Sequence, residues 1–427
     1  MLEIKDPVHG YIKLTELEQR LIDTPEFQRL RRIKQLSGAH YAYPGATHTR
    51  FSHSLGALYL AGYIGDIFVS KNFLSKDDLQ KLRIAALLHD IGHGPFSHLF
   101  EEVIFSKRNL THEDLTLRVI TETRIKDIIE SYGFSSKNIA NLAIGQSKED
   151  PLYMNEIIGG GLSVDVIDYV LRDAYFTGVE YGQVDVHRLL NSFEVYEKEN
   201  RLALDYAAIY SLEALFISRY EMFKAVYFHK TVRAAEIMLI QAFMLADDVL
   251  DFSNFKNIQS LIELDDESII SKIMHSQEDS LKESKAIIED VINRRLIKCV
   301  YEKIVHRKDP FIYQLLTQKD VRATLKKAIS AHAQVSEKTI FVDVSTAPSL
   351  PVNSKRETLN ELCVFTRSSK GPIFWYMPLS ENVVLNAISG YVDMIRVYTT
   401  IENREKVDKI ISSIFSSSQD FVSKLSL

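Results

Sequence analysis

Several features that mark particular classes of protein are scarce in this 427-residue sequence. Two cysteines, Cys299 and Cys363, are too few for a disulfide framework or a thiolate metal cluster, and they suit a reducing cytoplasm. The net charge is 51 − 57 = −6, so the composition makes no strong case for binding nucleic acid. The N-terminus shows no signal-peptide pattern, and the most apolar long stretch, residues 54–70, contains Asp66 and is short for a bilayer span. We therefore expect a cytoplasmic protein without membrane association.

The residues that are present predict a globular, mainly helical chain. Because single cores stop growing near about 250–300 residues, more than one folding unit is expected. Brief alternating runs at residues 3–5 and 11–14 flank the turn-forming residues 6–10, which predicts a β-hairpin. Apolar residues then recur at helical spacing in a stretch that begins near Pro25 and reaches Leu36. Further helices are expected at residues 55–69, 76–89, 112–131, 163–177, 206–250, 260–273 and 282–305.

The pattern changes near residue 335. Strands are expected at residues 339–344, 361–366, 372–377 and 394–398, with helices at 381–389 and 403–415. The predicted fold class is therefore mainly α. A helical body over residues 1–335 begins with the short β-hairpin and carries a small α/β unit over residues 336–427.

Histidine is unevenly distributed along the chain. Eight of the 13 histidines fall in the first 112 residues, where an even distribution would place about three (13 × 112/427). They are His9, His40, His48, His53, His89, His93, His98 and His112.

One part of this cluster has the chemistry of a metal site. The apolar run 84–88 leads into His89 and Asp90 and then breaks at a glycine- and proline-containing segment. Polar groups at the buried end of an apolar helix need partners, and a divalent cation is one such partner. Imidazole and carboxylate ligands together suit Mg, Mn, Zn, Fe, Co or Ni, so they do not select one metal.

Two other segments could complete the ligand set. Residues 48–54 contain His53, and residues 163–169 contain Asp165. Asp165, Tyr169 and Asp173 are four residues apart and share one helix face. One histidine and one aspartate from these segments would give two histidines and two aspartates. The alternative is that the histidines are hydrogen-bonded core residues, and the residues alone leave both interpretations open.

These motifs resemble a known family. The order His53, His89-Asp90, Asp165 resembles the HD-domain metal phosphohydrolases. A closer similarity, to the deoxynucleoside triphosphate (dNTP) triphosphohydrolases, is strong over roughly residues 3–120 and clear in patches to about 300. Its animal members combine a SAM domain with an HD domain, and we expect the SAM domain to be absent here. The matching segments are Asp6–Gly10, Ile22–Leu30, Ile33–Leu36, Tyr43–Ala46, Arg50–Gly56 and His89–His98.

The resemblance implies an HD-domain helical body and hydrolysis of dNTPs to deoxynucleoside and inorganic triphosphate. Activated water would attack the α-phosphorus, with one or two divalent cations screening the phosphate charge. The metal ligands it implies are His53, His89, Asp90 and Asp165.

The resemblance also implies catalytic roles close to the metal. His112, followed by Glu113, would belong to the catalytic pair that orients water or moves a proton. His93 and His98 would contact phosphate, with His98 as a general acid, because histidine donates protons readily near neutral pH. Arg50 would grip a phosphate with its planar fork. The alternative for His93 and His98 is hydrogen bonding in a structural turn.

Nucleoside recognition is implied by the same resemblance. Gln35 and Asp173 would bind the sugar 3′ hydroxyl, and Tyr169 would crowd the 2′ position. Arg219 would meet the outer phosphates, and Tyr227 would border the base. Without the resemblance, the two tyrosines are better interpreted as core aromatics, and Arg219 as the ion-pair partner of Glu213 or Glu221.

Some positions depart from the animal relatives. Val166 stands where they have a phosphate-contacting lysine, and Phe228 replaces a polar residue beside the base. Leu2 and Glu3 stand where lysine and valine are expected, which should weaken binding of an activating triphosphate. A GTP or dNTP effector is nevertheless expected, because several effector-site residues match. They are Asp23, Gln28, Arg31, Arg188, His229, Lys230, Arg294 and Lys298.

Two other functions stay open on the sequence. One is an HD phosphohydrolase that acts on nucleoside monophosphates, cyclic nucleotides or other phosphoesters, which Val166 favours. The other is a nucleotide-sensing protein with a weak or vestigial site, which the intact ligand set argues against. The family also suggests a homodimer or homotetramer.

Overall fold

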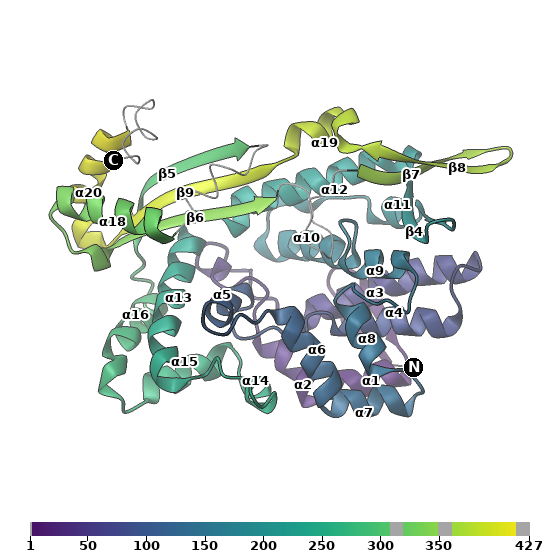
Figure 1. Ribbon diagram of the computed structural model, residues 1–427, viewed down its shortest axis with the longest axis horizontal. Coiled ribbons are helices and arrows are strands. Elements are labelled where there is room, and N and C mark those ends of the chain that lie inside the picture. The colour runs from purple at the N-terminus through teal and green to yellow at the C-terminus, as the bar shows by residue number, and fades with distance from the viewer. Residues whose placement is uncertain (1, 308–318, 349–360, 416–427) are drawn as a thin grey trace.

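The computed structural model describes residues 2–307, 319–348 and 361–415. A helical body forms the lower part of the molecule in Figure 1, and most of the strands lie along its upper side. The prediction of a mainly helical fold with an N-terminal hairpin and C-terminal strands is confirmed. The helices before residue 300 are α1 (Glu16–Ile22), α2 (Pro25–Gln28), α3 (Arg50–Ser70), α4 (Lys76–Leu88), α5 (His98–Arg108), α6 (His112–Glu122), α7 (Arg124–Ser131), α8 (Ser136–Ala143), α9 (Leu152–Gly159), α10 (Val164–Thr177), α11 (Val186–Leu190), α12 (Ile209–Met222), α13 (Lys230–Leu250), α14 (Gln259–Ile262), α15 (Asp266–His275) and α16 (Lys282–Ile292).

The later part of the chain mixes strands and helices. A three-stranded antiparallel sheet has the order β5-β9-β6, and helices α18 and α20 lie at its left end in Figure 1. A second sheet has the order β3-β4-β7-β8, in which β4 and β7 are parallel. The elements are β3 (Phe193–Tyr196), β4 (Arg201–Asp205), β5 (Lys298–Arg307), α18 (Lys319–Ala333), β6 (Ile340–Pro348), β7 (Glu361–Ser368), β8 (Gly371–Pro378), α19 (Val383–Ile388), β9 (Tyr391–Thr399) and α20 (Arg404–Phe415).

The N-terminal hairpin forms as its turn residues predict. Strands β1 (Leu2–Asp6) and β2 (Gly10–Leu14) are antiparallel, with Asp6 opposite Gly10. Asp6 Oδ1 accepts hydrogen bonds from the backbone N–H groups of Val8 and His9, both at 2.9 Å. Gly10 has φ +80°, a conformation that glycine adopts without steric cost.

Helix α3 is the central helix of the body. It is buried along most of its length and packs against α4 and α10. Its core-facing residues join a single hydrophobic cluster that extends from Ile12 in the hairpin to Tyr398 in β9. The first turns of α3, the end of α4 and the start of α10 therefore lie close together inside the body.

Several predicted helices are shorter than expected or interrupted in the structure, the first because backbone groups have other partners. The helix that begins at Pro25 gives way to a 3₁₀ turn at Arg29–Arg32, and the N–H groups of Lys34 and Gln35 then bond Asp266 Oδ2 and His48 O. Residues 112–131 form two helices that meet at Thr123, and residues 206–250 are interrupted by a π turn at Phe223–Tyr227.

The helix predicted over residues 282–305 is wrong beyond Ile292. Arg294 adopts a left-handed conformation with φ 57°, and the chain continues as β5 paired with β9. Strands β3 and β4 were not predicted.

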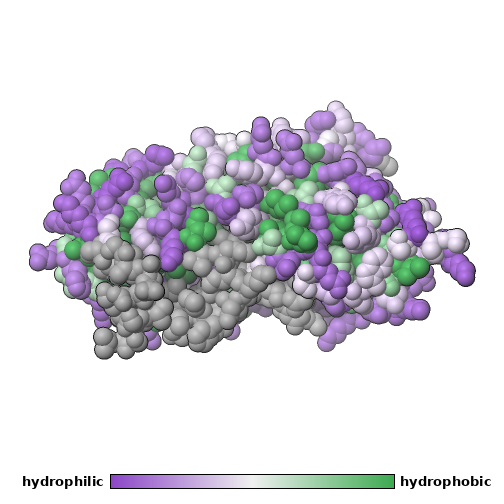
Figure 2. Space-filling model, turned by 90° about the horizontal axis from the view of Figure 1, so that it is seen from above, coloured by the Kyte–Doolittle hydropathy of each residue, from purple (hydrophilic) through white to green (hydrophobic). Residues whose placement is uncertain are grey.

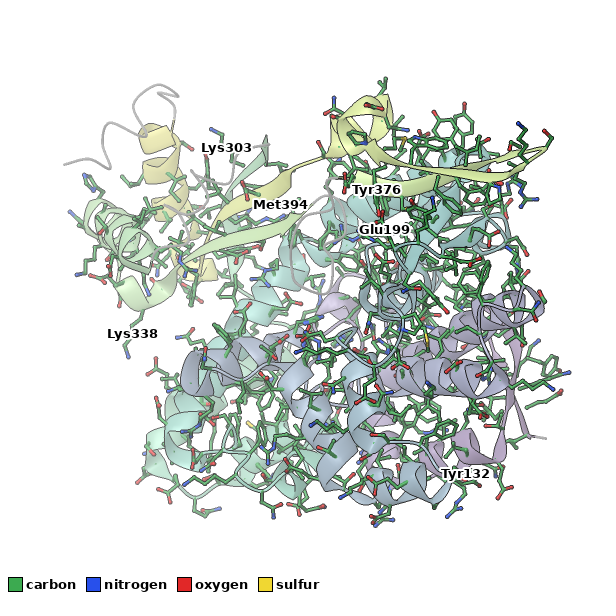
Figure 3. The ribbon with its side chains drawn as sticks, turned by 45° about the vertical axis from the view of Figure 1, so that its right-hand side comes forward. Tyr132, Glu199, Lys303, Lys338, Tyr376 and Met394 are labelled. Carbon is green, nitrogen blue, oxygen red and sulfur yellow. The ribbon has the colours of Figure 1, made fainter. Side chains whose placement is uncertain are left out.

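Strand pairing crosses the boundary predicted near residue 335, and the two-domain division stays a prediction. β5 precedes that boundary and pairs with β9, while Leu204 of β4 lies opposite Val364 of β7. Tyr376 on β8 donates a hydrogen bond to Glu199 in the β3–β4 turn, and Figure 3 shows these two side chains next to each other.

Seen from above, hydrophilic residues dominate much of the described surface, and hydrophobic residues gather in small groups (Figure 2). Among the described helices, none combines the length and the apolar character that crossing a membrane requires.

Candidate metal centre and active site

One cavity of about 450 Å³ collects side chains from distant parts of the sequence. Its volume lies within the range of roughly 300–1,000 Å³ that is usual for small-molecule sites. The predicted site residues that line it are Gln35, Arg50, Asp90, His93, His98, His112, Asp165, Tyr169, Asp173 and Tyr227.

The proposed metal ligands come from three helices that meet at this cavity. His53 lies in the first turns of α3 and is fully buried. Helix α4 ends at Leu88, so His89 and Asp90 follow directly on its buried apolar end. Asp165 lies in the first turn of α10, where the Ser163 side chain caps the helix by accepting from Val166 N.

The four side chains converge. His53 Nε2 lies 3.2 Å from His89 Nε2 and 3.1 Å from Asp165 Oδ1. His89 Nε2 lies 3.4 Å from Asp90 Oδ1 and 3.7 Å from Asp165 Oδ1. His53, His89 and Asp90 place one ligand atom each within 4.8 Å of one another.

Hydrogen bonds determine which ring nitrogens face this centre as acceptors. His53 Nδ1 lies 2.8 Å from Asp168 Oδ2, and His89 Nδ1 lies 2.8 Å from Ala86 O. A carboxylate and a carbonyl oxygen accept hydrogen bonds, so both Nδ1 atoms carry hydrogen. In neutral rings the two Nε2 lone pairs then point at each other and at two carboxylates. This arrangement fits a cation between them.

The electrostatics lead to the same conclusion. Burial disfavours charge on His53, but hydrogen bonds to Asp165 and Asp168 outweigh it and raise the pKa of His53 to about 10. Burial likewise opposes ionisation of Asp165, but the hydrogen bonds to His53 and His89 hold its pKa below the usual range. The centre therefore demands positive charge, which a divalent cation would supply. Imidazole and carboxylate ligands leave the choice of metal open.

Arg50, the predicted phosphate ligand, lies at the edge of this centre. Its Nη1 is 2.5 Å from Asp90 Oδ2, and its Nε donates to Ser97 Oγ at 2.9 Å. Burial opposes ionisation of Asp90, but the charge of Arg50 outweighs it and holds the pKa of Asp90 well below its usual range. The guanidinium thus lies where it can contact both the ligand carboxylate and an anion in the cavity.

A second group of histidines adjoins the first. His93 is buried and stacks on His112, with ring centroids 4.1 Å apart and planes 10° from parallel. Burial and the charges of Arg50 and His112 hold the pKa of His93 well below its usual range, so its ring is neutral.

The carboxylate bonded to His112 is Glu101, which no motif in the sequence had singled out, and the catalytic role of Glu113 stays a prediction. Glu101 Oε1 lies 2.8 Å from His112 Nδ1, and Glu101 Oε2 lies 3.0 Å from the exposed His98. Burial opposes charge on His112, but the hydrogen bond to Glu101 raises its pKa. Glu113 lies close enough for its charge to contribute to the same shift. His98 and Glu101 are three residues apart, and this helical spacing is the sequence signal that could have identified the contact between these two side chains.

The loop that carries His93 and His98 is held in a strained conformation. Phe96 and Ser97 both have φ 55°, which costs on the order of 1–3 kcal/mol each for residues other than glycine. Asp266 Oδ1 accepts from Phe96 N at 2.6 Å, and Ser37 Oγ donates to Phe96 O at 2.6 Å. These bonds from other segments keep the loop against the cavity.

The predicted nucleoside-binding residues Gln35, Tyr169, Asp173 and Tyr227 line the same cavity. Tyr169 OH is 2.8 Å from Arg219 Nε, and Tyr227 OH donates to Asp173 Oδ2 at 2.7 Å. Gln35 is buried, and its side-chain oxygen has no hydrogen-bond partner in the described protein. Both tyrosines line the cavity and also pack against buried hydrophobic residues.

The predicted effector residues divide between segments. Arg31 Nε donates to Gln28 Oε1 at 2.9 Å, close after Asp23 at the end of α1. Arg294 donates to Tyr41 O at 3.2 Å, and Lys230 begins α13. Effector binding stays a prediction.

Val166, which stands where the animal relatives have a lysine, is buried in the main core.

Two histidines without a role in the sequence analysis contact the aspartates of α10. His9 Nε2 lies 2.6 Å from Asp168 Oδ1, and His48 Nε2 lies 2.7 Å from Asp173 Oδ1. The two bonds span 159 and 125 residues, so no local pattern in the sequence could reveal them.

Comparison with known proteins agrees with this geometry. A model of the HD domain matches residues 50–173, and a model of the HD associated region matches residues 184–423. The chain is 34% identical over 320 residues to the uncharacterized protein YwfO of Bacillus subtilis (strain 168), covering 69% of this chain and 71% of that protein. A solved structure of a hypothetical protein from Aquifex aeolicus is similar with a TM-score of 0.76 and 29% identity, covering 96% of this chain and 99% of that one.

Other relatives carry a functional name. Identity is 34% over 319 residues with the deoxynucleoside triphosphate triphosphohydrolase SAMHD1 homolog of Dictyostelium discoideum. It is 32% over 346 residues with the deoxynucleoside triphosphate triphosphohydrolase SAMHD1 of Homo sapiens. Each match covers 71% of this chain, but the chain spans only 60% and 55% of those two relatives.

Proposed function

The chain belongs to the HD-domain family of metal-dependent phosphohydrolases, and we propose that it hydrolyses dNTPs to deoxynucleosides and inorganic triphosphate. The observation that carries the proposal is one cavity that brings two sets of side chains together. Asp90 and Asp165 of the metal centre line it beside the predicted nucleoside-binding residues Gln35, Tyr169 and Asp173, and three of these five residues lie four apart on α10. Relatives named as dNTP triphosphohydrolases support the same assignment.

In this proposal His53, His89, Asp90 and Asp165 hold the metal. A divalent cation there lowers the pKa of water and screens phosphate charge. Arg50, already oriented by Ser97, meets a phosphate oxygen.

The three histidines act next to the metal ligands. His93, which is neutral, donates a hydrogen bond to phosphate. His112, whose pKa is raised by the hydrogen bond to Glu101, orients the attacking water or moves a proton, and the exposed His98 delivers a proton to the departing 5′ oxygen.

The predicted nucleoside-binding residues recognise the deoxyribose in this proposal. Gln35 has an unpaired buried oxygen, and Asp173 has one carboxylate oxygen on His48 and the other on Tyr227. A sugar 3′ hydroxyl can donate to either group. Tyr169, tied to Arg219, occupies the space that a 2′ hydroxyl would need. Activation by GTP or a dNTP, and assembly as a homodimer or homotetramer, belong to the same proposal.

Product analysis tests the function. The full chain is incubated with each dNTP and Mn²⁺ or Mg²⁺, with and without GTP, and the products are separated by ion-exchange chromatography. Deoxynucleoside and triphosphate in equal amounts are expected, while monophosphate plus pyrophosphate would contradict the proposal. Asp165→Ala should abolish turnover, whereas Asp66→Ala, an exposed aspartate on α3, is the matched control.

A second candidate is hydrolysis of nucleoside monophosphates or cyclic nucleotides. It is favoured by the buried Val166, which supplies no charge for a triphosphate tail. Faster turnover of a monophosphate or a cyclic diester than of any dNTP would establish it. A chain that binds no metal, with His89→Ala behaving as wild type, would instead indicate a vestigial site.

A further inference from the structure

We propose that the turn of the N-terminal β-hairpin is part of the metal centre. In this inference His9 is a positioning residue that fixes Asp168, and Asp168 orients the ligand His53, so that the hairpin raises the affinity for a divalent cation. The inference rests on the metal site of the proposed function and is independent of its nucleotide substrate.

A continuous chain of hydrogen bonds joins the turn to the ligand. His9 Nε2 lies 2.6 Å from Asp168 Oδ1, and the other oxygen of the same carboxylate lies 2.8 Å from His53 Nδ1. Asp168 and His53 are fully buried, and the His9 side chain is 6% exposed. Water therefore does not replace either bond when it is lost.

A buried guanidinium completes the arrangement. Arg172, also fully buried, places Nε 2.8 Å from Asp168 Oδ2 and Nη1 2.8 Å from Asp6 Oδ2. One guanidinium thus faces two carboxylates, which leaves one net negative charge among buried groups. His53 and His9 are the neighbours that share this charge through hydrogen bonds. The arrangement favours a cation on the far side of His53.

The position of His9 is itself fixed from two directions. Asp6 Oδ1 accepts from the His9 backbone N–H at 2.9 Å, so the aspartate that pairs with Arg172 also shapes the turn. The His9 ring stacks on Tyr59 of α3, with centroids 4.9 Å apart and planes 24° from parallel. Because the ring is held by the turn and by α3, its N–H points at Asp168 without a large cost in side-chain entropy.

The consequence for metal binding follows from ligand orientation. A ligating histidine that donates its second N–H to a fixed carboxylate keeps its ring orientation and tautomer. Loss of such an outer partner costs roughly 10- to 100-fold in metal affinity. Without His9, one oxygen of Asp168 loses a donor, and the carboxylate can rotate away from His53.

Two substitutions at one position separate the hydrogen bond from the packing. His9→Phe keeps an aromatic ring on Tyr59 but removes the donor, while His9→Gln keeps an N–H at similar reach. Binding of Mn²⁺ alone to the metal-free full chain is measured by isothermal titration calorimetry. We expect His9→Phe to weaken binding by about 10-fold or more and His9→Gln to stay close to wild type. Tyr11→Ala, 62% exposed on β2, is the hairpin control and should bind as wild type.

Each result of the Mn²⁺ titrations either supports the role of His9 or overturns it. Equal Mn²⁺ affinity in His9→Phe and wild type would overturn the inference, and so would equal weakening in the phenylalanine and glutamine variants. If His9→Phe does not fold, His9→Asn serves instead, because its shorter amide cannot reach Asp168, and unchanged affinity there would also overturn it. Since Mn²⁺ alone is the probe, failure to hydrolyse dNTPs would refute the proposed function and leave this result standing.

Discussion

A single added methyl group on α3 should disrupt the metal centre from behind. A Cβ built on Gly56 would lie 1.8 Å from Asp168 Oδ1 and 2.4 Å from Arg172 Nη2. Ordinary contact begins at 3.4 Å, so the carboxylate must retreat by about 1.6 Å (3.4 − 1.8). A movement of that size breaks its bonds of 2.6 Å to His9 and 2.8 Å to His53.

The loss in free energy of unfolding expected for Gly56→Ala combines three contributions. Overpacking a core costs roughly 1–3 kcal/mol, and breaking a buried ion pair costs roughly 3–5 kcal/mol. Alanine recovers about 1 kcal/mol of helix propensity relative to glycine. Taking the lower values, the free energy of unfolding should fall by roughly 3 kcal/mol.

Urea denaturation of the metal-free chain measures this loss, and Mn²⁺ titration of the folded variant measures the effect on the ligand. Asp66→Ala on the same helix is the control, because the Asp66 side chain is exposed to solvent. It should change stability by less than about 1 kcal/mol. If Gly56→Ala is as stable as Asp66→Ala and binds Mn²⁺ like wild type, the Asp168 carboxylate does not depend on the space beside Gly56, and the reasoning is refuted.

Two further predictions concern the reaction. Glu101→Gln should lower the pKa of His112, whose protonated form is present below the raised pKa and lost above it. The alkaline limb of the kcat/KM profile should therefore move to lower pH, and a limb that does not move would show that His112 does not cause it. Tyr169→Phe removes the hydroxyl that lies 2.8 Å from Arg219, so KM for a dNTP should rise by roughly 10-fold with little change in kcat in steady-state assays. A fall in kcat alone would argue against a positioning role for that bond.

The parts of the fold that could be predicted are those specified by local patterns. Long apolar or periodic runs identified α3, α4 and α10, and the turn residues identified the hairpin. The candidate metal ligands could be identified from the sequence, because metal binding needs histidines and aspartates at buried helix ends. The structure brings one ligand atom from each of His53, His89 and Asp90 to within 4.8 Å of the others.

The parts that could not be predicted depend on contacts between distant segments. Strand β5 was interpreted as helix because its pairing partner β9 lies about ninety residues away, and the isolated pattern is ambiguous. The role of Glu101 was missed because its bond to His112 spans eleven residues and forms only where α5 places Glu101 between His98 and His112 in space.

Helix α10 supplies the aspartates that several of the histidines in the first 112 residues contact. Asp165, Tyr169 and Asp173 lie four residues apart and face the cavity, whereas Asp168 and Arg172 face α3 and the hairpin. His53 and His9 bond Asp168, and His48 bonds Asp173. A metal ligand and a proposed sugar ligand therefore share one rigid element. Any substitution that tilts α10 should change Mn²⁺ affinity and discrimination between deoxyribose and ribose together, whereas substitution of His9 should change the first alone.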